Sequence, residues 1–173
     1  MEIHRIVTQP QLVVFASSSK RIRGRKLDRT EFRFVFGKPK QFIGTEKHWV
    51  AKQDAIEVGD RERTIIDGQR EPEYCGGMSE VARVLWMRRK SIQTGKIMDY
   101  VLRLGIGVVI LRPGCLPELD GIAPESELAK VCKSPTATYL PLDPVLPKEG
   151  PHLKRRQILL NITPKELEAV RAS

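Results

Sequence analysis

The segment from residue 61 to residue 86 constrains the fold most, because its proline, glycines and apolar residues are spaced as in two helices joined by a turn. A first helix is predicted over 61–70, with Asp60 before it as the N-cap residue. Pro72 ends this helix, since proline has no amide hydrogen to donate and restricts the residue that precedes it. A second helix is predicted to follow.

The turn before the second helix contains Gly76 and Gly77, which together with Cys75 predict a tight reversal that tolerates positive φ. Ser79 lies at the predicted helix start and Glu80 in its first turn, where a negative charge interacts favourably with the helix dipole. The apolar residues then recur three and four positions apart, as on the buried face of a helix: Met78, Val81, Ala82, Leu85 and Trp86.

Short β-strands are predicted ahead of these helices. The apolar and β-branched runs lie at residues 11–16, 30–36, 48–51 and 55–58. In the second run Phe32, Phe34 and Phe36 share one face and Arg33 and Val35 the other, which is typical of a half-buried strand. The first 60 residues are therefore expected to form a small, mostly antiparallel sheet.

The remaining sequence mixes both kinds of element, so the predicted class is α+β, in a single domain that spans residues 1–173. The middle is helical and the chain ends in a strand and a helix. The predicted elements are a helix over 97–104 that ends at Gly105, a strand or short buried helix over 107–111, a helix over 125–132, an extended segment over 134–151, a strand over 157–162 and a last helix capped by Thr163.

Positive charge is concentrated near the amino terminus. The formal net charge is +9, and the first 50 residues hold 11 Lys and Arg against 4 Asp and Glu, whereas the remainder holds 19 against 17. Six cations fall within ten residues that have no apolar period and read as an exposed loop or hairpin: Lys20, Arg21, Arg23, Arg25, Lys26 and Arg29. This run predicts an anionic partner, either nucleic acid or an acidic protein face; a solvated surface with no partner is the alternative.

No catalytic motif is present. The sequence has no nucleophile elbow, phosphate-binding loop or dinucleotide fingerprint, and its three Cys and three His residues are scattered, so neither a metal nor a cofactor is expected. Five acidic residues lie close together in the sequence and could bind magnesium or act as acid and base. They are Glu62, Asp67, Glu71, Glu73 and Glu80. Charges on helices are more often paired structurally, so we expect no enzyme activity.

No apolar run is long enough to span a bilayer and no secretory signal is recognised, so a cytoplasmic protein with free thiols is expected.

Several blocks occur in a familiar order. They are the basic run, RERTIID with Glu62, Arg63, Thr64 and Asp67, PEYCGG with Gly76 and Gly77, YVLRLGIGVVILRPGCLPEL, YLPLDPVLPKEG and QILLN. From about Leu12 to Ile162 this order resembles the carboxyl-terminal domain of AbiEi-family antitoxins. Pro113, where the family usually has leucine, and residues 155–157, where an aromatic residue is common, depart from the pattern.

The resemblance implies an antitoxin of a type IV toxin–antitoxin, or abortive infection, system. It implies a nucleotidyltransferase-like toxin as the functional partner, without a stable complex, and a structural role for the six motif residues. Family members commonly begin with a promoter-binding winged helix-turn-helix, which is not recognised here, so the chain alone is expected to show no sequence-specific operator binding. The alternative function is a nucleic-acid-binding transcriptional regulator that uses residues 20–29.

Overall fold

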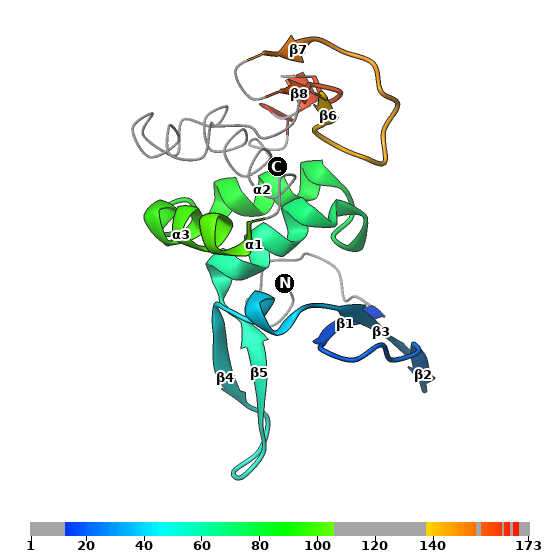
Figure 1. Cartoon of the computed structure of the whole chain (residues 1–173), viewed down its shortest axis with the longest axis vertical. Coiled ribbons are helices and arrows are strands. Elements are labelled where there is room, and N and C mark those ends of the chain that lie inside the picture. The colour runs from blue at the N-terminus through cyan, green and yellow to red at the C-terminus, as the bar shows by residue number, and fades with distance from the viewer. Residues whose placement is uncertain (1–12, 106–137, 155–156, 164, 167, 170–173) are drawn as a thin grey trace.

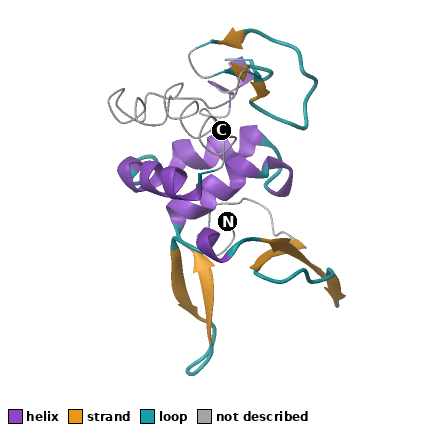
Figure 2. Cartoon of the chain, viewed as in Figure 1, coloured by secondary structure: helices purple, strands orange, loops and turns teal. Residues whose placement is uncertain are grey.

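Three helices occupy the centre of the molecule, and small sheets flank them (Figures 1 and 2). The computed structural model describes residues 13–105, 138–154, 157–163, 165–166 and 168–169. The α+β class predicted from the sequence is confirmed. Figure 1 places the two amino-terminal sheets on one side of the helices and the carboxyl-terminal sheet on the opposite side.

The helices are α1 (Arg61–Arg70), α2 (Met78–Arg88) and α3 (Thr94–Leu104). Asp60 caps α1 as predicted, since the Arg63 amide donates to its Oδ1 at 2.8 Å. Pro72 ends α1 and begins the 3₁₀ turn η2 (Pro72–Tyr74). Gly105 closes α3 in the left-handed conformation, also as predicted.

The turn between α1 and α2 needs both of its glycines. Gly76 has φ of 88° and Gly77 has φ of 97°, which residues with a Cβ adopt only under strain. A Cβ on Gly77 would also lie 3.3 Å from Oδ2 of Asp143, the oxygen that accepts a hydrogen bond from the Met78 amide at 2.8 Å. The start of α2 is therefore capped by a residue 65 positions later in the chain, and Ser79 takes no part in the cap.

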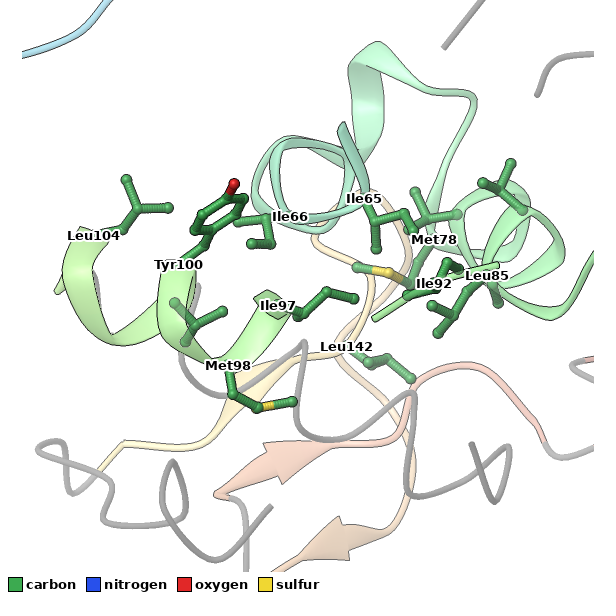
Figure 3. Packing of buried hydrophobic residues seen from close by; sticks show 14 of the residues in the cluster. Ile65, Ile66, Met78, Leu85, Ile92, Ile97, Met98, Tyr100, Leu104 and Leu142 are labelled. Atoms are coloured by element: carbon green, nitrogen blue, oxygen red, sulfur yellow. The ribbon is translucent and has the colours of Figure 1, made fainter. Parts of the chain in front are cut away.

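The buried core is formed by the helices together with the carboxyl-terminal segment. Figure 3 shows side chains of all three helices converging, with Leu142 reaching them from the later segment. The cluster is Ile65, Ile66, Met78, Val81, Ala82, Val84, Leu85, Ile92, Ile97, Met98, Tyr100, Val101, Leu104, Leu142, Ile158 and Ile162. No described residue of the amino-terminal strands belongs to it.

One residue of the predicted stripe on α2 is placed differently. Val84 is buried, whereas Trp86 is only half-buried, so the prediction that Trp86 lies in the core is wrong. The buried arc of α2 is turned toward the side of Val84, and Trp86 is left at its edge. There the Arg89 guanidinium lies 4.0 Å from the centroid of the indole ring.

The amino-terminal strands divide between two sheets. The first has the order β1–β3–β2, from β1 (Val13–Ser18), β3 (Thr30–Phe36) and β2 (Arg25–Leu27), and the second pairs β4 (Thr45–Trp49) with β5 (Ala55–Gly59). The turn η1 (Pro39–Gln41) lies between the two sheets in sequence. The β2–β3 and β4–β5 pairs are antiparallel as expected, but β1 is parallel to β3. Alternation of apolar residues indicates strands and does not reveal which strands pair.

The carboxyl-terminal sheet has the order β6–β8–β7 and consists of β6 (Leu140–Pro141), β7 (His152–Leu153) and β8 (Ile158–Leu159). The predicted strand over 157–162 is thus shorter than expected. Thr163 forms the predicted cap, because its Oγ1 accepts from the Glu166 amide at 3.2 Å. The predictions for 107–111 and 125–132, and for the beginning of 134–151, lie outside the described residues. Within the described part, no helix has the length and apolar composition needed to cross a bilayer.

Candidate functional site

The six clustered cations lie on an exposed arm, defined here as residues 20–29, and every residue of this basic arm is exposed. Its second half is a hairpin in which Arg25 lies opposite Phe32 and Lys26 opposite Glu31. Asp28, with φ of 51°, occupies the two-residue turn, where aspartate tolerates the left-handed conformation better than most residues. The sequence prediction of an exposed loop or hairpin is confirmed.

The six cations of the basic arm are held in no ion pair with a described residue, although Asp28 lies within the arm and Glu31, opposite Lys26, attracts that charge through space. Among the described residues, no carboxylate lies within ion-pairing distance of any of the six cations. The nearest acid along the sheet, Glu31, instead binds Arg33, with 2.6 Å between Oε1 and Nε. The hydrogen bond from Arg33 lowers the pKa of Glu31, which keeps that carboxylate charged. The arm therefore presents a positive field to solvent.

The two faces of the β1–β3–β2 sheet differ. Side chains alternate along a strand, so Phe15 and Arg33 share one face, while Phe32, Phe34 and Phe36 share the other. The Phe15 ring stacks on Tyr74 of η2, with 4.3 Å between centroids, which attaches the first face to the body of the molecule. The face that carries the three phenylalanines is named the aromatic face below.

Cations from the basic arm reach the aromatic face. The Arg21 guanidinium lies 5.5 Å from the centroid of the Phe36 ring, and 46% of the Phe36 residue surface is exposed. Near the end of β1 an open hollow of about 490 Å³ is lined by Ser17, Ser18, Ser19, Pro39 and Phe42. The sequence analysis did not predict that the basic arm lies beside the phenylalanines. The alternating phenylalanines directly follow the basic run in the sequence, and this order could have indicated it.

The acidic residues do not gather into a site. Glu62 accepts hydrogen bonds from the Gln93 amide and from Lys96, both at 3.1 Å. Asp67, Glu71 and Glu80 each lie beside an arginine, namely Arg63, Arg70 and Arg83. Glu73 is exposed. Within the described residues, no three Asp, Glu, His or Cys side chains come close enough to hold a metal ion together.

The motif residues connect the elements of the helical centre. Arg63 is 7% exposed, and its Nη1 donates to the backbone carbonyls of Gln41 and Ile43, the latter at 2.9 Å. Asp67 accepts from Nε of Arg63 at 2.9 Å, so this contact lies within α1. Thr64 donates through Oγ1 to the Gly59 carbonyl at 3.2 Å, which anchors α1 to the end of β5.

A partly buried group of polar side chains joins α1 to α3. Lys96 Nζ lies 3.1 Å from Oδ2 of Asp60 and 3.1 Å from Oε2 of Glu62, and the Tyr100 hydroxyl donates to the same Asp60 oxygen at 2.8 Å. Burial opposes the charge of Lys96, but its hydrogen bonds to both carboxylates outweigh that effect and raise the pKa of Lys96. Burial, reinforced by the hydrogen bond to Asp60, raises the pKa of Tyr100. These groups satisfy one another's hydrogen bonds and so join α3 to the start of α1.

Cys75 is a free thiol, and burial raises its pKa to about 11. A thiol with so high a pKa is almost entirely protonated at neutral pH and is a poor nucleophile. The other two cysteines, Cys115 and Cys132, lie outside the described residues.

The fold and the exposed groups therefore describe an α+β protein that carries an exposed cationic arm beside a face of phenylalanines. No family model matches the sequence, and neither the curated proteins nor the solved structures yield a match.

Proposed function

We propose that this chain is an antitoxin-like protein of a type IV toxin–antitoxin, or abortive infection, system. In this proposal it counteracts a nucleotidyltransferase-like toxin, catalyses no reaction itself and forms no lasting complex with the toxin. The observation that carries the proposal is the contrast between the basic arm, whose cations form no described ion pair, and the three carboxylates of α1 and α2, all of which are engaged by neighbouring cations. Such a protein is equipped to bind an anionic partner through its surface.

The resemblance to the AbiEi antitoxins supports the same proposal. Its motif residues Arg63 and Thr64 make contacts that hold the helical centre together, and the Gly77 amide donates to the Pro72 carbonyl at 2.8 Å in the turn before α2. The basic arm then serves to engage either the nucleic-acid substrate of the toxin or an acidic face of a protein.

Rescue of growth tests this function. Cells that express a nucleotidyltransferase toxin encoded beside this chain should recover when the chain is co-expressed. Replacing Arg21, Arg23 and Arg25 by Gln should weaken rescue while the melting temperature stays nearly constant, because exposed charges contribute at most about 1 kcal/mol each. The matched control replaces three exposed lysines elsewhere, Lys47, Lys52 and Lys148, by Gln. Equal rescue by both triple variants would contradict a role for the basic arm.

A second candidate function is a nucleic-acid-binding regulator. The density of six unpaired cations along the basic arm favours it, since phosphate backbones attract such runs without sequence information. Binding should weaken steeply with salt, by about 0.9 log units per phosphate contact for duplex DNA for each log unit of salt. If the arginine triple variant loses nucleic-acid binding but still rescues cells, the regulator is the better description. If it loses rescue and keeps nucleic-acid binding, the antitoxin acts through a protein contact.

A further inference from the structure

We propose that the aromatic face of the β1–β3–β2 sheet is a binding site for single-stranded nucleic acid. Unpaired bases stack on Phe36 and Phe42, and the basic arm holds the phosphates. This inference rests on the second candidate function, because it assumes that the anionic partner of the basic arm is a nucleic acid, and it specifies which form of nucleic acid is bound and through which rings.

The aromatic face is available because the opposite face of the sheet is already used. Phe15, on that opposite face, stacks on Tyr74, so the row of Phe32, Phe34 and Phe36 points away from this contact. Phe32 and Phe34 are half-buried, and Phe36 is exposed at the end of the row. A sheet that displays phenylalanines two residues apart on one strand is a known platform for stacking successive bases.

Cations lie near both ends of β3. Arg21 lies over Phe36, with 5.5 Å between the guanidinium carbon and the ring centroid, and Arg25 lies opposite Phe32 in the sheet register. Lys38 and Lys40 are exposed beyond the end of β3. Guanidinium planes and aromatic rings both stack on bases, while ammonium groups bind phosphates, so a strand laid along β3 meets both kinds of group.

The hollow at the end of β1 adds polar groups to this surface. Ser18 lies opposite Phe36 in the register, and the Gly37 amide donates to the Ser18 carbonyl at 2.9 Å, so the hollow and the exposed ring are neighbours. Phe42, 38% exposed, forms part of its wall. Serine hydroxyls both donate and accept hydrogen bonds, as base edges and a ribose 2′-hydroxyl require.

The exposed rings distinguish a single strand from the other polyanions. In a duplex the faces of the bases are covered by their neighbours, and an acidic peptide would pair with the cations without using the phenylalanines. Only a single strand offers phosphates for the basic arm and free base faces for Phe36 and Phe42 together.

Binding by the full 173-residue chain to 15-nucleotide oligouridine and oligothymidine, and to a 15-base-pair duplex, tests the proposal by fluorescence anisotropy. The double variant Phe36→Leu with Phe42→Leu keeps the volume of exposed apolar groups but removes the rings. It should bind the single strands at least about tenfold more weakly and the duplex unchanged, since stacking contributes about that much per base. Trp49→Leu, an exposed aromatic on the separate β4–β5 hairpin, is the matched control and should bind as the original chain does.

The salt dependence gives a second readout that needs no variant. Extrapolated to 1 M salt, where counterion release no longer contributes, the original chain should retain affinity for oligothymidine and lose it for the duplex. Equal affinity for both at 1 M salt, or unchanged single-strand binding by the phenylalanine double variant, would overturn the stacking site. If the arginine triple variant nevertheless loses binding, the regulator function survives and only this inference fails. Equal competition by polyglutamate would overturn both.

Discussion

At the scale of single residues, Arg63 has contacts that its position in the sequence does not predict. In the sequence it is an ordinary charge in the first turn of a helix, whereas in the structure it is buried and donates to two backbone carbonyls from the segment before β4. Those carbonyls lie 22 and 20 residues earlier, beyond the range of any helical periodicity. Position 63 requires arginine, because only the planar guanidinium has enough donors to bind both carbonyl oxygens and Asp67 at once.

Arg63→Met should therefore destabilise the protein by about 2–4 kcal/mol, because it leaves two carbonyls without their donor and removes a partly buried ion pair. Arg103→Met is the control, since Arg103 is exposed and, among the described residues, pairs only with the exposed Asp99, at 3.5 Å. It should cost less than about 0.5 kcal/mol. Urea unfolding of both variants measures the difference, and equal costs would show that the Arg63 contacts are not stabilising.

Lys96 and Tyr100 predict how stability responds to high pH. Both have pKa values raised in the folded protein, so the folded state keeps their protons at a pH where the unfolded state has begun to lose them. Their contribution is complete below the unfolded values of about 10, and it declines as the pH rises through the folded ones. Cys75, whose pKa is raised to about 11, adds a decline that begins near its unfolded value of about 8.5. The free energy of unfolding should therefore be level from about pH 7 to 8, begin to fall near pH 8.5 and fall more steeply above about pH 10.

The variants Lys96→Met and Tyr100→Phe should each flatten the decline above about pH 10, because each removes a group that the folded protein keeps protonated there. Lys52→Met, at an exposed position on the loop between β4 and β5, should leave it unchanged. The measurement is chemical unfolding at a series of pH values. An alkaline decline of the same steepness in Lys96→Met and Lys52→Met would place its origin outside the group formed by Asp60, Glu62, Lys96 and Tyr100.

At the scale of elements, α2 separates what periodicity can predict from what it cannot. Its start, and the burial of Met78, Val81 and Leu85, follow from the spacing of apolar residues, and the structure confirms them. The position of Trp86 does not follow, because the edge of a buried stripe depends on which neighbours pack beside the helix. The same limit applies to β1, whose strand character is evident in the sequence and whose parallel pairing with β3 is not.

Replacing Leu85 and Trp86 individually by Ala should reveal this edge. Leu85 is 0% exposed, and its truncation should cost about 3–5 kcal/mol through lost burial and the cavity left behind. Trp86→Ala should cost less than Leu85→Ala despite the larger side chain removed, because the ring is half-buried. Thermal or urea unfolding measures the loss of stability in each variant. A larger loss for Trp86→Ala than for Leu85→Ala would show that Trp86 belongs to the core.

At the scale of the whole molecule, the buried core and the proposed binding surface lie in different parts of the chain. The core draws on α1, α2, α3 and the segment around Leu142 and Ile158, whereas the basic arm and the aromatic face belong to a sheet without a described core residue. Composition and charge located the arm in the sequence because six cations in ten residues are a local signal. The partner elements of the core come from residues far apart in sequence, and no local pattern identifies them.

This separation predicts unequal protection of backbone amides against hydrogen exchange. The β4–β5 hairpin is exposed over nearly its whole length, and isolated two-stranded hairpins are marginally stable in water. Its amides should exchange at least about a hundredfold faster than those of Ile66, Leu85 and Val101, which exchange only when the core opens. Exchange followed by NMR tests this; uniform protection would mean that hairpin and core unfold as one unit.

The hydrogen bond from the Met78 amide to Asp143 also has a consequence for synthesis of the protein. Because Asp143 follows Met78 by 65 residues, a ribosome working at about 5–20 residues per second needs about 3–13 s to supply this acceptor after Met78 has been added. Throughout that interval the first amide of α2 cannot form its hydrogen bond to Asp143, and the Leu142 side chain that enters the core is also absent. The nascent chain therefore completes its helical centre only after the carboxyl-terminal segment has left the ribosome, and a message that stalls between these codons yields a chain with α2 unanchored.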